Sequence, residues 1–486
     1  FVDMSNQVII IGSGFGGMCA AINLLKDGID DFLILERRPF MGGTWCQNTY
    51  PGAAVDVPSP LYSIFSEPYD WSQMFAERSE LEAYTKHIIE KYKLADKTVL
   101  NACVEQLLWH NDTQQWEIKV GDSKPYLCQF VINATGPLST PITPDFEGRE
   151  SFQGKAFHTN DWDHGCDLKG KKVAVIGSGA SGAQVIPAIA PEVEQLHVFQ
   201  RTPHWVMPRP DRMFSKRQRA LLRKPWAYNL LRRWIYWTFE LRVIAFKYSK
   251  KALDFVGKTQ AIKHIESQIS DPKLRVKVIP DYTFGCKRVI MSSTLYPALG
   301  RENVMLQDQG IKRITATGIV TGDGQEIDLD VIVYSTGFDF IDGLISYPVI
   351  GKTGKKLHDF WQTYPRAYLG TSVPGFPNLF MITGPNTGIG HTSALFVIEA
   401  QLLYIMSCIR AVKIEQASSI DVSSDAEAEY TDMIHSEMQQ TVWQRGGCKS
   451  WYKSDSGYVV AMFPGFTFSF RRLANKFRRK HHIFSR

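Results

Sequence analysis

Two glycine-rich turns in this 486-residue chain have residue types and a spacing that could do chemistry. Each has the spacing GxGxxG, in which the first glycine permits a tight turn and the second lets the backbone approach a pyrophosphate. The third glycine lets a helix pack closely on the preceding strand, so that a phosphate rests at the helix N-terminus. The turns consist of Gly12, Gly14 and Gly17, and of Gly177, Gly179 and Gly182. We therefore expect two dinucleotide sites.

The residue at a fixed distance after each turn distinguishes the two sites. Glu36 lies twenty-four residues after Gly12, and Arg201 lies twenty-four residues after Gly177. A carboxylate accepts hydrogen bonds from free ribose hydroxyls, whereas an arginine can pair with a 2′-phosphate. We therefore expect FAD or NAD in the first unit and NADPH in the second. The alternative for Arg201 is an ordinary surface arginine.

Strand and helix patterns place both turns in the same local structure. The first turn follows the β-branched run of residues 7–11 and leads into a helical pattern over residues 18–28. The second follows a similar run, residues 172–176, and also leads into a helical pattern. Later strands that end in a Thr-Gly turn, at residues 135–136 and 336–337, occur once in each unit. This repeat predicts an α/β fold with two Rossmann-type dinucleotide-binding domains.

A loop rich in glycine and proline, residues 41–59, carries large side chains where a solvent loop would carry small polar ones. These are Trp45, Tyr50 and the acid Asp56. Loops of this composition usually line a ligand. We expect this loop to contact a cofactor.

Between the two units lies a polar segment, residues 150–165, whose residues fall at the spacing FxGxxxHxxxWD. It lacks the periodicity of a core helix or strand, and it therefore predicts an interdomain linker with fixed positions. The alternative is an ordinary loop. The fixed positions are Phe152, Gly154, His158, Trp162 and Asp163.

Residues 211–270 are basic, aromatic and helical in pattern, which predicts a helical insertion in the second domain. Apolar residues recur there every three or four positions, as on one face of a helix. Charged residues interrupt the run, so it cannot span a bilayer. We expect this face to pack on the protein body and to roof a substrate cavity, with a membrane-surface helix as the alternative. The apolar positions are Leu230, Trp234, Trp237, Leu241 and Ile244.

Composition and charge indicate a globular protein, with 44% hydrophobic and 21% charged residues. The net charge of +6 is concentrated at the C-terminus, and we interpret the basic tail as a solvated end rather than a nucleic-acid site. The eight cysteines form no CxxC pair and have no zinc-ligand spacing. They predict reduced thiols in a cytoplasmic protein without a metal site. No leader pattern precedes the first strand, so we expect no signal peptide.

With these motifs in place, the chain resembles the flavin-containing monooxygenases over essentially its full length. Within them it is similar to the type I Baeyer–Villiger monooxygenases. Three features carry the resemblance: FxGxxxHxxxWD over residues 152–163, GGxWxxxxYPGxxxD over residues 42–56, and the two GxGxxG turns. The resemblance implies four segments of the chain. These are an FAD-binding domain of residues 1–145 and 380–486, a fingerprint linker of residues 146–165, an NADPH-binding domain of residues 166–208 and 284–379, and a helical insertion of residues 209–283.

The resemblance also implies a reaction. NADPH reduces FAD, O2 then gives a C4a-peroxyflavin, and one oxygen atom is inserted next to a ketone carbonyl to give an ester or lactone. An anionic intermediate needs a cation beside it in a dry site. The matching position is Arg288, which we expect Asp56 to orient. The alternative reaction is oxidation of sulfur or nitrogen in thioethers, thioamides or amines.

Further site residues follow from the same resemblance. Lys287 and Thr202 are expected to assist Arg201 on the 2′-phosphate, while His158 and Trp162 are expected to couple domain movement. Trp451 contacts either the nicotinamide ribose or substrate, or only packs. The remaining expected cofactor-binding residues are Thr44, Trp45, Asp56, Tyr62 and Asn386.

Two other classes of protein fit the sequence less well. A pyridine nucleotide–disulfide reductase needs a redox-active cysteine pair, and no CxxC or close variant is present. A membrane-binding or nucleic-acid-binding module would not explain two dinucleotide turns. We expect a small-molecule substrate and no nucleic acid, and the sequence leaves the oligomeric state open.

Overall fold

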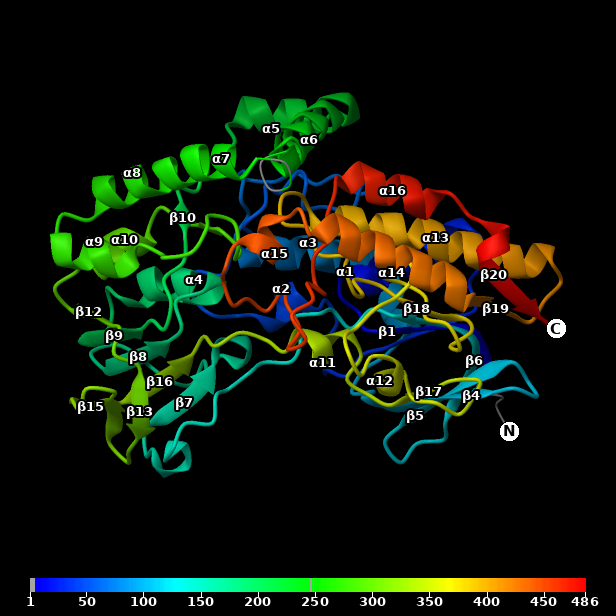
Figure 1. Cartoon of the computed structure of the whole chain (residues 1–486), viewed down its shortest axis with the longest axis horizontal. Coiled ribbons are helices and arrows are strands. Elements are labelled where there is room, and N and C mark those ends of the chain that lie inside the picture. Colours follow the sequence, from blue (N-terminus) through cyan, green and yellow to red (C-terminus); the bar gives the residue numbers. More distant parts are fainter. Residues whose placement is uncertain (1–4, 245–246, 248) are drawn as a thin grey trace.

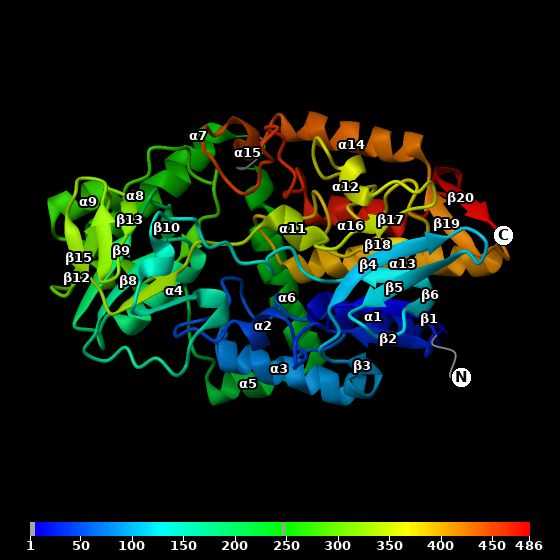
Figure 2. The ribbon, with the colours of Figure 1, turned by 90° about the horizontal axis from the view of Figure 1, so that it is seen from below.

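A computed structural model describes residues 5–244, 247 and 249–486. The chain forms two lobes, one built on a mixed sheet and the other on a parallel sheet, and the two lobes can be told apart in two perpendicular views (Figure 1, Figure 2). In each lobe, one strand leads into a glycine turn and then into a helix. The predicted α/β fold with two Rossmann-type units is therefore confirmed. Residues 1–4, on which the expectation about a leader partly depends, lie outside the described residues.

The first lobe contains an eight-stranded sheet in the order β17-β4-β5-β6-β1-β2-β3, with β18 also paired to β6. β1 lies between β2 and β6 in parallel, and Ile10 pairs with both Ile34 and Ile132. The side chains of residues 8–11 of β1 are buried, as expected of a β-branched run covered on both faces. The strands are β1 (Ser5–Ile11), β2 (Phe32–Leu35), β3 (Thr98–Val99), β4 (Val104–His110), β5 (Gln115–Val120), β6 (Tyr126–Asn133), β17 (Val349–Ile350) and β18 (Leu379–Met381).

Helices from both ends of the chain cover the first sheet (Figure 1). α1 (Phe15–Lys26) packs against α13 (Ala394–Ile414), and α13 packs against α16 (Thr467–Asn475). Among the described residues, α13 alone is long and apolar enough to cross a membrane, with a mean hydropathy of 1.7. However, 72% of its most apolar window is buried inside the protein, so α13 serves as a core helix. Further helices of this lobe are α2 (Thr44–Gln47), α3 (Arg78–Lys91), α14 (Ser424–Met438) and α15 (Val442–Arg445).

The second lobe contains a five-stranded parallel sheet in the order β12-β9-β8-β16-β7. A separate antiparallel sheet of β13 (Ile311–Ile314), β14 (Gly318–Thr321) and β15 (Glu326–Asp328) matches the hairpin pattern of the sequence. The parallel strands are β7 (Lys155–His158), β8 (Lys172–Ile176), β9 (Gln195–Phe199), β12 (Val304–Gln307) and β16 (Val331–Tyr334), and α4 (Ala180–Ile189) follows β8.

Part of the linker of residues 150–165, which the sequence predicts to be no core element, forms the edge strand β7. Residues 155–158 pair in parallel with β16, from Val331↔Lys155 to Tyr334↔His158. Lys155 and Ala156 are exposed because β7 is an edge strand. An edge strand needs backbone pairing on one side only and tolerates polar side chains, so its sequence shows no apolar run.

The helical insertion begins and ends at a short parallel pair, β10 (Val206–Met207) and β11 (Ile290–Met291). This pair brings the two ends of the insertion together, and the helices between them lie across the top of both lobes in Figure 1. They are α5 (Lys216–Leu222), α6 (Pro225–Glu240), α7 (Lys250–Ala252), a π-helix (Leu253–Lys258), α8 (Thr259–Gln268) and α9 (Pro272–Val278).

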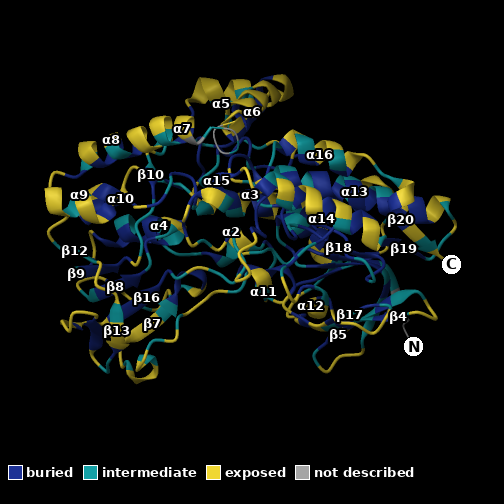
Figure 3. Ribbon diagram, viewed as in Figure 1, coloured by how far each residue is buried: buried dark blue, intermediate teal, exposed yellow. Residues whose placement is uncertain are grey.

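The predicted orientation of α6 was wrong. Its apolar face points outward, with Leu230 62% and Trp234 63% exposed, and Figure 3 shows α5 and α6 as mainly exposed. The opposite face is buried, with Tyr228, Ile235 and Tyr236 in the core of the first lobe and with polar anchors beside them. Arg232 donates to the Ser63 carbonyl at 2.8 Å, and Glu240 accepts a hydrogen bond from Thr467 at 2.8 Å.

Candidate active site

At the first glycine turn, neighbouring backbone atoms leave no room for a side chain on Gly12 or Gly17. Gly12 has φ +102°, and a Cβ there would lie 2.4 Å from the Ala134 carbonyl oxygen. A Cβ on Gly17 would lie 2.0 Å from the Gly12 carbonyl oxygen, which explains the close packing of helix on strand. No side chain caps the N-terminus of α1. Its first N–H groups are therefore free to bind a phosphate.

Glu36 lies at the end of β2 beside this turn and is 3% exposed. Its carboxylate accepts hydrogen bonds from the Ser13 backbone at 3.0 Å, the Ser13 hydroxyl at 2.6 Å and the Arg38 backbone at 2.9 Å. A carboxylate has about four lone-pair sites, so one can still accept from a ribose hydroxyl. The three protein contacts fix the carboxylate in place for that contact.

The loop of residues 41–59 approaches the same turn. A Cβ on Gly43 would lie 2.6 Å from the Gly14 Cα, so α2, which starts with the exposed Thr44, begins directly beside the candidate pyrophosphate site. Trp45 donates its indole N–H to the Tyr62 hydroxyl at 3.2 Å. Burial raises the pKa of Tyr62 to about 12, so this phenol is neutral. Three of the predicted cofactor contacts, Thr44, Trp45 and Tyr62, thus lie close together beside the first glycine turn.

The second glycine turn repeats the geometry of the first. Gly177 has φ +105°, and a Cβ there would lie 2.2 Å from the Ser335 carbonyl oxygen. A Cβ on Gly182 would lie 2.4 Å from the Gly177 carbonyl oxygen. No side chain caps α4. Around Gly179 the nearest atom to an added Cβ is His204 Cε1, at 4.0 Å, which leaves space for a phosphate beside the backbone.

Two cations share the far end of this turn. Burial lowers the pKa of Lys287, and the positive charge of Arg201 lowers it further, so the two side chains are electrostatically coupled. Neither forms an ion pair with the residues that the structure describes. Thr202 follows Arg201 and is half-buried. Arg201 and Lys287 are neighbouring cations without an ion-pair partner, and such a pair fits a doubly charged phosphate.

His204 belongs to this site and was missed in the sequence. Burial lowers its pKa to about 4, and the charge of Lys287 contributes. Its Nδ1 is buried and has no hydrogen-bond partner in the described structure. The only sequence signal was its place three residues after Arg201, which is too weak to select it.

Arg288 and Asp56, 232 residues apart in sequence, form an ion pair. Arg288 Nε donates to Asp56 Oδ2 at 2.9 Å, and Nη2 donates to the same oxygen. The charge of Asp56 raises the pKa of Arg288 above its usual range, so the guanidinium stays protonated. The Arg288 side chain remains 44% exposed, so its other N–H groups can reach a ligand. Asp56 thus holds the Arg288 guanidinium in place as a fixed cation.

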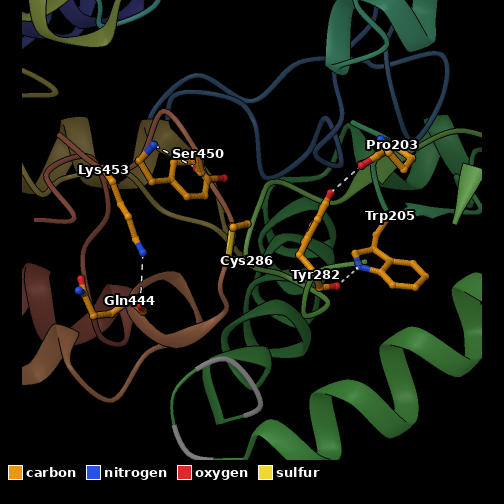
Figure 4. Close-up of a disulfide and its surroundings, with 9 residues drawn as sticks. Pro203, Trp205, Tyr282, Cys286, Gln444, Ser450 and Lys453 are labelled. Atoms are coloured by element: carbon orange, nitrogen blue, oxygen red, sulfur yellow. Dashed lines mark hydrogen bonds between the residues drawn. A yellow bond between two sulfur atoms is a disulfide. The ribbon is translucent and has the colours of Figure 1, made fainter. Parts of the chain in front are cut away.

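A disulfide lies next to these cations and corrects the expectation of eight reduced cysteines. Cys286, directly before Lys287, is bonded to Cys448, 162 residues later. Figure 4 shows Cys286 between the loop of Tyr282 and the C-terminal loop that carries Ser450 and Lys453. No CxxC spacing marks this pair, because only the tertiary fold brings the two segments together. The six other cysteines are free.

The disulfide holds two aromatic residues of the C-terminal loop near the site. Tyr452 is buried, its pKa is raised to about 12 by burial, and its hydroxyl lies close enough to Arg288 to interact with its charge. Trp451 is 42% exposed, and its ring lies 4.6 Å from Tyr452 and 5.5 Å from Phe340. Tyr452 was not singled out in the sequence.

Asn386, which was expected to bind a cofactor, is buried and uses its side-chain amide within the protein. Its side-chain amide donates to the Val459 carbonyl at 2.8 Å and to the Met462 carbonyl at 3.0 Å. Both donors therefore brace the C-terminal loop. Asn386 lies on the loop that leads to α13, which begins at Ala394 after the Ser393 cap.

The linker residues are mainly packed into the second lobe. His158 is buried, its Nδ1 accepts from the Asn160 backbone at 3.0 Å, and burial lowers its pKa. A Cβ on Gly154 would lie 2.3 Å from the Asp330 carbonyl oxygen. Trp162 packs against Phe157. Phe152 packs against the second core cluster of this lobe, and Asp163 accepts from the Gly165 backbone at 2.9 Å.

The linker also contacts the loop of the first lobe. Gln47 donates to the Asn160 carbonyl at 2.7 Å, and Thr49 pairs with His164 at 2.7 Å. These bonds connect residues beside the first glycine turn with residues beside β7. The segment is therefore placed to transmit movement between the lobes.

Two uncapped glycine turns, a carboxylate at one and a pair of cations at the other, define a flavoprotein oxidoreductase with two dinucleotide sites. The pyridine nucleotide-disulphide oxidoreductase family matches residues 6–225. A Baeyer-Villiger monooxygenase of Pseudomonas aeruginosa is 43% identical over 97% of this chain and 90% of that protein. A Baeyer-Villiger monooxygenase of Streptomyces coelicolor is 41% identical over 96% of this chain and 90% of that protein.

Solved structures agree with these relatives. The closed crystal structure of cyclohexanone monooxygenase has a TM-score of 0.88 at 26% identity, and covers 99% of both chains. The OTEMO complex with FAD and NADP has a TM-score of 0.89 at 26% identity, again over 99% of both chains. The chain belongs to the Baeyer–Villiger monooxygenase family. The resemblance in the sequence is confirmed, and with it a monooxygenase that uses FAD, NADPH and O2; oxidation of sulfur or nitrogen as the main activity is not favoured.

Proposed function

We propose that this enzyme converts a ketone into an ester or lactone and that Arg288, held by Asp56, supplies the fixed positive charge for oxygen insertion. The Arg288–Asp56 ion pair carries this proposal, because it holds a permanent cation with free N–H groups between the loops of the two units. A preorganised charge costs no reorganisation when the substrate carbonyl oxygen becomes negative.

The chain's own residues divide the work of holding the cofactors. FAD, when bound, supplies the hydride acceptor and the activation of O2. The first glycine turn binds its pyrophosphate and Glu36 accepts from its ribose, while Trp45 and Tyr62 line the adjoining loop. Asn386 acts indirectly, because its amide positions the loop of residues 459–462.

The NADPH site occupies the second unit. Arg201, Lys287 and Thr202 bind the 2′-phosphate, and the uncapped start of α4 binds the pyrophosphate. His204 stays neutral beside them and donates or accepts through its unpaired Nδ1. The domain limits follow this division, with the FAD unit in residues 1–145 and 380–486 and the NADPH unit in residues 166–208 and 284–379. The linker of residues 146–165 contributes β7 to the NADPH unit.

The first prediction tests the cation. Arg288→Ala should fold, bind FAD and still oxidise NADPH, but its rate of ester formation should fall by roughly 10²–10³. The consumed oxygen should appear as hydrogen peroxide, because an oxyanion on the substrate loses its partner. Stopped-flow reduction and product analysis measure the two half-reactions separately.

Two variants control this experiment. Asp56→Ala should shift the products the same way and less far, since it orients the cation without supplying the charge. Lys287→Ala should raise the Michaelis constant for NADPH and leave the ratio of ester to peroxide unchanged. A normal ester yield from Arg288→Ala, with a changed ratio in Lys287→Ala, would move the role to Lys287.

The substrate class needs a direct assay. A panel of linear, cyclic and aryl ketones beside a thioether, scored by product mass, decides which carbonyl compound the enzyme accepts. A cytoplasmic location is part of the proposal and is tested by cell fractionation. Free-thiol labelling of Cys286 and Cys448 in intact cells would show whether their disulfide exists in that compartment.

A further inference from the structure

We propose that the outward face of α6 docks this enzyme on an anionic lipid surface. Six large apolar side chains form this face, and each is between 48% and 63% exposed. Such a contiguous apolar surface is rare on a soluble monomer and marks an interaction site. The docking face consists of Trp226, Leu230, Trp234 and Trp237 on α6, and of Leu241 and Ile244 directly after its end.

The docking face is a fixed feature of the fold. Its residues are spaced by three or four positions, so they share one side of the helix. The reverse side is tied to the first lobe: Tyr228 accepts the Trp71 indole N–H at 3.1 Å and pairs with the Ser63 hydroxyl at 3.0 Å. Glu240, fully buried, pairs with His391 at 2.9 Å. The helix therefore cannot rotate its apolar side inward without breaking these bonds.

The apolar surface continues onto the neighbouring helix α16. The ring of Trp237 lies 5.9 Å from the ring of Phe468, which is 41% exposed. Arg471 and Arg472 follow on the exposed side of α16. The surface thus spans two helices from distant parts of the sequence, which lie near each other in Figure 1.

The positive charge around the docking face indicates an anionic partner. Residues 212–253 contain twelve Lys or Arg and a single acid, Glu240, which is buried. Four of these cations, Arg219, Arg223, Arg232 and Lys247, pair with acids of other segments. Lys224, Arg233 and Arg242 are exposed beside the face, and none forms an ion pair with the residues that the structure describes. An apolar tryptophan-rich face bordered by cations matches helices that lie in the interface of anionic membranes.

The same charge disfavours the other occupants. A two-fold dimer would place identical patches against each other, and two cationic surfaces repel. The helix cannot span a bilayer, because α6 has 16 residues, about 24 Å, and carries buried charges. It can lie in the plane of the membrane, with the tryptophans at the headgroup level. The inference stands independently of the reaction proposed above.

Vesicle co-sedimentation of the FAD-loaded full chain tests the proposal. The probes are vesicles of phosphatidylcholine alone and of phosphatidylcholine mixed with phosphatidylglycerol, each at low and high salt. The enzyme should bind the mixed vesicles at low salt and leave them at high salt. Trp234→Asn and Arg233→Glu should each lower the partition coefficient by roughly fivefold to tenfold.

Matched controls remove general effects of surface change. Ile414→Asn alters a side chain that is 80% exposed at the end of α13, and Lys124→Glu reverses an exposed charge in the first lobe. Both controls should bind vesicles as the wild type does. All four variants should keep the wild-type melting temperature and their activity in buffer; if Trp234→Asn does not fold, Leu230→Asn replaces it.

Three outcomes would overturn the proposal. In the first, the wild type does not bind the mixed vesicles. In the second, Trp234→Asn and Arg233→Glu bind them as well as the wild type does. In the third, the two control variants lose as much binding as these two variants. Self-association in buffer that Trp234→Asn abolishes, without vesicle binding, would assign the face to a second copy of the chain instead.

Discussion

At the scale of single residues, the second nucleotide site combines charges that would repel each other without a ligand. Lys287 lies near Arg201 and near His204, and both its burial and the charge of Arg201 lower its pKa. Burial, together with the charge of Lys287, lowers the pKa of His204 to about 4, so this imidazole is neutral. The site is therefore poised for an anion, since a phosphate would relieve the repulsion between the cations.

The cofactor preference can be predicted from these charges. Arg201→Ala should raise the Michaelis constant for NADPH at least tenfold, because a charge-assisted hydrogen bond contributes roughly 1.5–3 kcal/mol. The constant for NADH, which lacks the phosphate, should hardly change. Steady-state kinetics with both nucleotides measures the effect. Equal losses for both nucleotides would show that Arg201 does not contact the phosphate.

At the scale of elements, the loop of residues 41–59 connects the first lobe with helix α4 of the second. Tyr50 donates to the Gln184 side chain at 2.8 Å, and Gln184 donates back to the Ala54 carbonyl at 2.8 Å. A Cβ on Gly52, which has φ +83°, would lie 2.4 Å from the Gln184 carbonyl oxygen. Asp56 lies on the same loop, so this contact also positions the ion pair with Arg288.

Substituting Gly52 tests this contact. Gly52→Ala should lower the free energy of unfolding by roughly 1–3 kcal/mol and decrease the ester yield, because the loop must move away from α4 and takes Asp56 with it. Chemical denaturation and product analysis measure the two effects. Gly28→Ala is the matched control, since Gly28 has a similar φ of +76° but no atom within 4 Å of an added Cβ.

The control separates backbone strain from the collision with α4. Gly28→Ala should cost the strain alone and should keep the normal ester yield. If both variants lost the same stability and the same ester yield, the contact between the loop and α4 would not position Asp56.

At the scale of the whole molecule, segments distant in sequence connect the two lobes. The linker contributes β7 to the second sheet and hydrogen-bonds to the first-lobe loop through Gln47 and Thr49. The Cys286–Cys448 disulfide joins the C-terminal loop to the residues before Lys287. We therefore expect a movement of one lobe to be transmitted to both sides of the Arg288 site.

Removing the linker histidine should affect this coupling. His158→Ala should keep FAD bound but slow turnover, because the ring packs against Phe338 and positions Asn160, which contacts Gln47. FAD content and the rates of flavin reduction and ester formation provide the measurement. Phe157→Leu, a change in the same strand, is the control for packing. Loss of FAD from His158→Ala would show a purely structural role.

Much of the fold and the nucleotide chemistry was determined by the sequence itself. A GxGxxG turn needs consecutive residues in one strand–turn–helix unit, so its spacing is visible in the chain. The same holds for Glu36 and Arg201, whose offsets from the turns are set by one helix and one strand. The family motifs around Trp45 and His158 are equally local.

The tertiary structure alone decided features that depend on distant partners. The outward face of α6 could not be predicted, because periodicity identifies an apolar stripe but not which side finds a partner. Here Glu240 pairs with His391 and Thr467, more than 150 residues away, while Ile235 on the same side of α6 enters the core of the first lobe. With that side buried, the tryptophans face the surface. Cys286 contacts Cys448 because the C-terminal chain returns to the second lobe. The burial of apolar side chains and the pairing of buried polar groups across distant segments therefore decided what the local pattern left open.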